Sequence, residues 1–195
     1  MKINESGRSM IEMLGVLSII GVLSTSGIAL YSKAMEKRKL SVLSDQVVEI
    51  ANNIHNVYMS RRNYCGLDMP TKTKDKHKLI PTNMWKTGKN GKTVAHHILG
   101  GEVEIGHCAK CDGDKGGLTC GKDQTNKYFK IAVKNIDKKA CISIISSEWP
   151  DDTIIGIGKT ASATSNKYIG ANAANAATEC TSLCSSGCTV SFIMR

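Results

Sequence analysis

An uncharged apolar run near the N-terminus constrains this chain more than any other feature. Residues 13–32 form a stretch of 20 residues without a charged side chain. A helix needs about 20 apolar residues to cross roughly 30 Å of hydrocarbon. Glu12 stands at the head of the run, and a carboxylate in such surroundings is costly unless it has a partner or a function. The run therefore predicts a helix that lies in a membrane or in an equally apolar assembly.

The residues before this run add a second pattern. A short polar leader, MKINESG, ends at Gly7, and Glu12 is the fifth residue counted from Arg8. Such a leader, such a glutamate and an apolar helix together resemble the start of a type IV prepilin. The resemblance implies that a prepilin peptidase cuts between Gly7 and Arg8, that the new amine on Arg8 is methylated, and that Glu12 pairs with this amine of a neighbouring subunit. Because an unpaired buried charge is costly, such a pair can set the register of docking.

Three other interpretations of the run stay open. In an ordinary secretory signal peptide, Lys2 and Arg8 would form the basic region and residues 24–26 the small-residue cleavage site. The run could also be a plain membrane anchor or a buried core helix, the latter disfavoured by its length. The glutamate inside the run and the unbroken helical pattern beyond Tyr31 argue against the signal peptide.

The second half of the helix is expected to be amphipathic. Apolar residues recur there at steps of three and four, which is one face of an α-helix: Leu40, Leu43, Val47, Ile50, Ala51, Ile54, Val57 and Tyr58. One helix over residues 8–62 would be about 80 Å long, too long to be buried in a single domain. The sequence thus predicts a leader at residues 1–7, a transmembrane or filament-core half at 8–31, an amphipathic half at 32–62 and a globular head at 63–195.

The cysteines indicate the compartment in which the head folds. The chain has eight among 195 residues: Cys65, Cys108, Cys111, Cys120, Cys141, Cys180, Cys184 and Cys188. An even count in an exported domain with few aromatic residues indicates a disulfide framework, with 105 possible pairings among which sequence does not choose. The basic cluster at residues 33–39 would by itself orient that end of the apolar run to the cytoplasm, but the cysteines favour export.

Two lysine-rich stretches lie in the head. Residues 71–92 hold seven lysines and a single acid, so this basic loop is a solvated surface or, less favoured, a contact for an anionic surface or DNA. Disulfides are expected to staple the second stretch, an insert at residues 106–127. Two less favoured alternatives there are a zinc site on His107, Cys108, Cys111 and Cys120, and a calcium loop on Asp112, Asp114 and Asp123. No metal or cofactor is predicted.

The rest of the head is expected to alternate strands and helices. Strand patterns occur at residues 103–105, 128–134, 153–158 and 189–194, Asp137 can cap a helix that Pro150 ends, and residues 162–175 are expected to form a loop. Cys180 and Cys184, four residues apart, would share a helix face. Together with the runs YCGL at 64–67 and GGEVEI at 100–105, this order resembles the type IVb pilins. That resemblance implies an α+β fold, with the long helix packed on an antiparallel β-sheet, and a bond from Cys141 to Cys180 or Cys184.

The resemblance also implies a function. The chain would be a structural subunit of a bacterial type IV pilus (a fimbrium), a homopolymer used for adhesion, motility or DNA and plasmid transfer. Its partners would be other pilin subunits, the prepilin peptidase and the inner-membrane assembly platform, and it would lie in the inner membrane before assembly and be extracellular afterwards. The alternatives are a pseudopilin of a type II secretion system and a secreted cysteine-rich binding protein. Since no nucleophile, base and orienting group appear as a set, no catalysis is predicted.

Overall fold

The computed structural model describes the main elements of the chain and leaves short segments between them undescribed. Described are residues 6–61, 63–67, 76–87, 93–108, 127–149, 153–158, 167–169, 177–178, 180–182, 184 and 187–195. These residues fall into two units, Met1–Lys39 and Leu40–Arg195, and each is treated by itself below.

The first element is the long helix α1, Ser6–Tyr58. Within the unit that starts at Leu40, its buried side chains are those of the expected stripe: Leu43, Val47, Ile50, Ala51, Ile54 and Tyr58. Val57 is an exception with 45% exposure, because it lies about 100° from Tyr58 around the helix, at the rim of the stripe. The helix also ends four residues before the expected Arg62, since the Arg61 N–H donates to the Tyr58 carbonyl at 2.8 Å and closes a turn.

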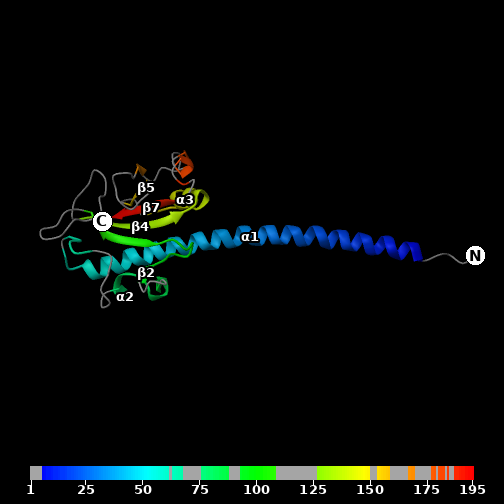
Figure 1. The fold of residues 1–195 in the computed structure, drawn as a ribbon, viewed down its shortest axis with the longest axis horizontal. Coiled ribbons are helices and arrows are strands. Elements are labelled where there is room, and N and C mark those ends of the chain that lie inside the picture. Colours follow the sequence, from blue (N-terminus) through cyan, green and yellow to red (C-terminus); the bar gives the residue numbers. More distant parts are fainter. Residues whose placement is uncertain are drawn as a thin grey trace, which may run out of the picture. The chain divides into compact units, whose positions relative to one another are not determined.

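A five-stranded antiparallel sheet forms the centre of the head, in the spatial order β3-β4-β7-β5-β6 (Figure 1). Its strands are β3 Val103–His107, β4 Phe129–Ile136, β5 Ile154–Gly158, β6 Lys167–Ile169 and β7 Cys188–Met194. The expected strands are confirmed, and the C-terminal strand β7 is the middle one, paired to β4 on one side and β5 on the other. The expectation of a loop over residues 162–175 is wrong at β6, which pairs with β5 through three residues. A strand this short has no detectable period in the sequence.

Part of the expected basic loop is folded. The short helix α2, Lys76–Leu79, and a 3-10 turn, Thr82–Met84, lead into a two-stranded antiparallel sheet of β1, Trp85–Thr87, and β2, Thr93–Ala95. The Asn53 side chain of α1 donates to the Leu79 carbonyl at 3.4 Å and so connects α2 to the long helix. Residues 68–75 and 88–92 of the loop lie outside the described residues.

The core lies between the sheet and the C-terminal half of α1 (Figure 1). Alternate side chains of the two central strands point into it: Phe129, Ile131 and Val133 from β4, and Val190, Phe192 and Met194 from β7. The other face of these strands is also closed, since Lys130, Ala132, Ser191 and Ile193 are buried. The sheet centre is therefore covered on both faces, which the alternation in the sequence did not indicate.

The helix α3, Lys138–Ile145, packs its buried residues into the same core. Asp137 caps it as expected, because its Oδ1 accepts a hydrogen bond from the Ala140 N–H at 3.0 Å. The expectation that Pro150 ends this helix is wrong, since it stops at Ile145. The Trp149 Nε1–H donates to the Ile144 carbonyl at 2.7 Å, which satisfies one of the last helical acceptors without a further turn.

Candidate assembly surface and the ties of the head

The unit formed by residues 1–39 presents an apolar helix surface. Over residues 10–31 every large apolar side chain is more than half exposed: Met10, Ile11, Met13, Leu14, Val16, Leu17, Ile19, Ile20, Val22, Leu23, Ile28, Leu30 and Tyr31. Glu12 is exposed among them. By length and composition α1 could cross a membrane. An apolar surface of this size is stable only when lipid or another apolar surface covers it.

Three hydroxyl groups on this half of α1 donate hydrogen bonds to carbonyls of the same helix. Ser18 Oγ donates to the Gly15 carbonyl at 2.7 Å, and Ser26 Oγ donates to the Val22 carbonyl at 2.8 Å. Thr25 Oγ1 lies 3.0 Å from the same Val22 carbonyl. Because these groups need no water, the helix can enter a hydrocarbon environment without leaving these hydroxyls unsatisfied. The sequence indicated only that these residues are small.

Three glycines provide places for close approach on the same half. A Cβ built at Gly15, Gly21 or Gly27 would meet nothing within 4 Å. Small residues on an apolar helix let a second helix come near its backbone. α1 is continuous through these glycines and through residues 24–26, the site of the alternative signal-peptide cleavage. The expected processing residues, Gly7 and Arg8, lie in the first turn of α1, and their side chains are outside the described set.

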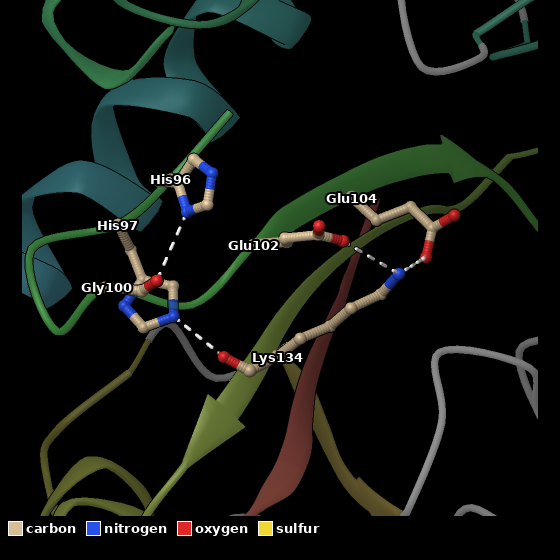
Figure 2. A network of polar contacts seen from close by, with 6 residues as sticks. All are labelled: His96, His97, Gly100, Glu102, Glu104 and Lys134. Carbon is tan, nitrogen blue, oxygen red and sulfur yellow. Dashed lines mark hydrogen bonds and ion pairs between the residues drawn. The ribbon is translucent and has the colours of Figure 1, made fainter. Parts of the chain in front are cut away.

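In the head, the turn of residues 97–101 joins β2 to β3 and is fastened to two other elements. The Ile98 N–H donates to Gln46 Oε1 of α1 at 3.1 Å. The Nε2 atom of the buried His97 lies 2.8 Å from the Lys134 carbonyl of β4 (Figure 2). A Cβ at Gly101 would collide with the Lys134 backbone and with His97, so only glycine permits this approach. The turn is thereby held against both the long helix and the sheet.

The hydrogen bonds of His97 determine its protonation. The Leu99 N–H donates to His97 Nδ1 at 3.2 Å, so Nδ1 is an acceptor and the proton of the neutral ring lies on Nε2, from which it is donated to the Lys134 carbonyl. Burial lowers the pKa of His97, the hydrogen bond to the Lys134 carbonyl opposes this shift, and the nearby His96 lowers the pKa further. His97 is therefore neutral in the folded head at neutral pH.

We expect the stability of the head to fall on acidification because of His97. Its pKa is lower in the folded state than in the unfolded chain, so the unfolded chain binds the proton first, and stability present above about pH 6.5 is lost as the pH falls below it. The titratable group that acts on the ring is His96, and the contact from β4 is the backbone carbonyl of Lys134, which does not titrate. Urea unfolding of the full chain in detergent, followed by tryptophan fluorescence at pH 7.5 and 5.5, measures the effect.

The matched control for this experiment is His97→Gln, which keeps a polar side chain but does not titrate. The difference in unfolding midpoint between the two pH values should be smaller in this variant than in the wild type. An equal difference in both proteins would mean that other groups account for the acid sensitivity.

Charged side chains link β3 to β4 on the face of the sheet away from α1. Lys134 Nζ lies 3.1 Å from Glu104 and 3.8 Å from Glu102 (Figure 2). These pairs are partly exposed and contribute little stability. Burial lowers the pKa of the neighbouring Lys130 to about 8, against the influence of Glu104, which raises it. Sequence reasoning singled out neither Lys130 nor His97, because their partners are distant in the chain.

Two disulfides tie the C-terminal part of the head. Cys141 of α3 is bonded to Cys180, with the two Cα atoms 5.9 Å apart, and Cys184 is bonded to Cys188, with Cα atoms 4.6 Å apart. Of the two partners that the resemblance implied for Cys141, the structure has Cys180. Helical residues are described at 177–178 and 180–182. Cys184 lies just after them, and its N–H donates to the Cys180 carbonyl at 3.0 Å, so the two cysteines are one turn apart and both lie next to Cys141, as expected.

The other cysteines belong to the first part of the head. Cys65 and Cys108 are each disulfide-bonded. Cys111, Cys120 and the three aspartates of the alternative calcium loop lie outside the described residues. His107 is buried in β3 with Nδ1 3.1 Å from the Leu67 carbonyl. Since a sulfur in a disulfide is not a zinc ligand, the oxidised Cys108 disfavours the alternative zinc site.

Comparison with known proteins decides the family. A family model described as PilS N terminal matches residues 37–194. The chain belongs to the PilS family. This match confirms the resemblance to type IV pilins, which are structural subunits of pili and not a known class of enzyme, and the long helix with its antiparallel sheet is the fold that the resemblance implied.

Among solved structures, the PilS-family chain is similar to one titled "Crystal structure of type IV b pilin from Salmonella typhi". The two are 18% identical with a TM-score of 0.47, and the match covers 80% of this chain and 96% of the other. No curated protein sequence matches this chain.

Proposed function

We propose that this PilS-family protein is the polymerising subunit of a type IV pilus, held in the inner membrane by α1 before assembly and extracellular afterwards. The observation that carries the proposal is the exposed apolar surface of residues 10–31. Lipid can cover this surface before assembly, and the same surface of neighbouring subunits can cover it afterwards. The filament would serve adhesion, motility or DNA transfer, with the basic loop at residues 71–92 as its contact for anionic partners.

The proposed assembly step depends on one charge pair. Cleavage between Gly7 and Arg8 by a prepilin peptidase, followed by methylation, would place an ammonium group on Arg8. Glu12 is the one carboxylate at the head of a 20-residue uncharged run, so in a filament core it has a strong electrostatic preference for the ammonium group of an adjacent subunit. The inner-membrane assembly platform would bring the two subunits together.

The first test of this proposal is the N-terminus of the mature protein. We expect the chain recovered from the cell envelope to begin at Arg8 and to carry one added methyl group, because Gly7 and Glu12 bracket the processing site. Intact mass and N-terminal sequencing measure both features. A strain without the prepilin peptidase is the control and should retain residues 1–7. A chain that begins at Gly27 would contradict the proposal and support a secreted protein.

A further inference from the structure

The two C-terminal disulfides lie against each other in the core. The Sγ atoms of Cys141, Cys184 and Cys188 are all within 4.8 Å of one another, and all three residues are buried. Cys141 is bonded to Cys180, and the other two are bonded to each other. One half of the first disulfide is therefore in near contact with both sulfurs of the second.

This arrangement is the starting geometry for disulfide exchange. Exchange requires a thiolate next to a disulfide sulfur, and the folded chain already supplies that proximity. We propose that Cys141 can change its partner, so that the covalent tie between α3 and the C-terminal segment passes from Cys180 to Cys184 or Cys188.

The exchange is balanced without an oxidant. An external thiolate that attacks Cys180 Sγ forms a mixed disulfide with it, breaks the Cys141–Cys180 bond and leaves Cys141 as a thiolate. The Cys141 thiolate then attacks Cys184 Sγ, a Cys141–Cys184 bond forms, the Cys184–Cys188 bond breaks, and the electron pair goes to Cys188, which takes up a proton. Attack on Cys188 instead leaves Cys184 as the thiol. Cys141 lies in the first turn of α3, where the helix N-terminus favours a thiolate, whereas burial opposes it.

Exchange preserves a long-range tie. Cys188 is the first residue of β7, and Cys184 lies four residues before it. A bond from Cys141 to either residue still connects α3 to the beginning of the last strand. The four-residue separation closed by Cys184 and Cys188 is no longer bridged, whereas a long loop like that of the Cys141–Cys180 bond, with its separation of 39, stays closed. In the chain-entropy model the longer loop contributes the larger stabilisation.

The test uses Cys180→Ser in the full chain, exported to an oxidising compartment, purified in detergent, acid-quenched, alkylated and digested with trypsin without reduction. Cleavage after Lys139, Lys159 and Lys167 puts Cys141 in one peptide and Cys184 and Cys188 in another. We expect the two peptides to be linked in most molecules, with one alkylated cysteine in the C-terminal peptide. Separate peptides, with Cys141 alkylated and the Cys184–Cys188 bond intact, would overturn the proposal.

Cys141→Ser is the control, since neither peptide can then be linked to the other through residue 141. If Cys180→Ser does not fold, the wild type gives the same information. A substoichiometric phosphine opens one disulfide, and acid quenching and alkylation then fix the products. We expect molecules in which Cys180 is alkylated while the two peptides remain linked. If every molecule with an alkylated Cys180 also has an alkylated Cys141, the exchange does not occur.

Discussion

Replacing Glu12 by alanine should leave the subunit in the membrane and remove it from filaments. The apolar run of α1 that would anchor the protein is unchanged, so its insertion should be unaffected. In the proposed filament core, the ammonium group of the adjacent subunit would lose its counter-charge, and one buried charge left unpaired costs about 3–5 kcal/mol. Incorporation into filaments is therefore expected to fall by at least about tenfold.

The measurement compares the variant in sheared filaments and in the inner-membrane fraction by immunoblot. Glu36→Ala is the matched control, since it removes another glutamate of α1 that lies outside the apolar run. It should assemble like the wild type, and Glu12→Asp, which keeps the charge on a shorter side chain, should be intermediate. Wild-type levels of Glu12→Ala in filaments would contradict the charge pair.

Cys141→Ser should loosen the C-terminal half of the head while leaving the rest folded. The bond it removes spans a sequence separation of 39 residues, and the chain-entropy model gives it about 4 kcal/mol. The segment before Cys180, residues 161–177, has few large apolar residues, so burial contributes little to ordering it. Strands β5 and β7 should lose most protection, whereas the C-terminal half of α1 and strand β3 should keep theirs.

Hydrogen exchange on the full chain in detergent, resolved by peptide, measures this loss of amide protection. Cys184→Ser/Cys188→Ser is the control, because it removes the disulfide of the small loop and leaves the long tie intact. If the exchange proposed above occurs, Cys180→Ser should lose less protection than Cys141→Ser. Unchanged hydrogen-exchange protection over residues 153–158 and 188–194 in Cys141→Ser would mean that packing alone holds β7.

Periodic features of the fold could be predicted from the sequence. The buried stripe on α1, the Asp137 cap and the strands β4, β5 and β7 follow from local patterns that are repeated over several residues. The hairpin of β1 and β2 and the edge strand β6 could not, because each strand is three residues long and lies among lysines or small residues. Three residues are too few to show a period, so nothing in the local pattern marks these strands or their partners.

The candidate site divides in the same way. The apolar surface of α1 and the place of Glu12 are local and could be read from the sequence. The partner of Cys141 could not be chosen, since spacing leaves the eight cysteines equivalent. His97 was missed because its partner Lys134 is 37 residues away and its ring is buried only after β3 and β4 have paired.

The central place of β7 affects the order in which the head can fold. Before β7 arrives, β4 is paired only to β3, and β5 only to β6, so the chain holds two separate strand pairs with open edges. Two-stranded pieces of this kind have little stability of their own, and their edges invite pairing with other chains. The sheet can therefore close only when β7 is available to pair with both β4 and β5. If the head crosses a membrane as proposed, its open strand edges need protection until β7 has emerged.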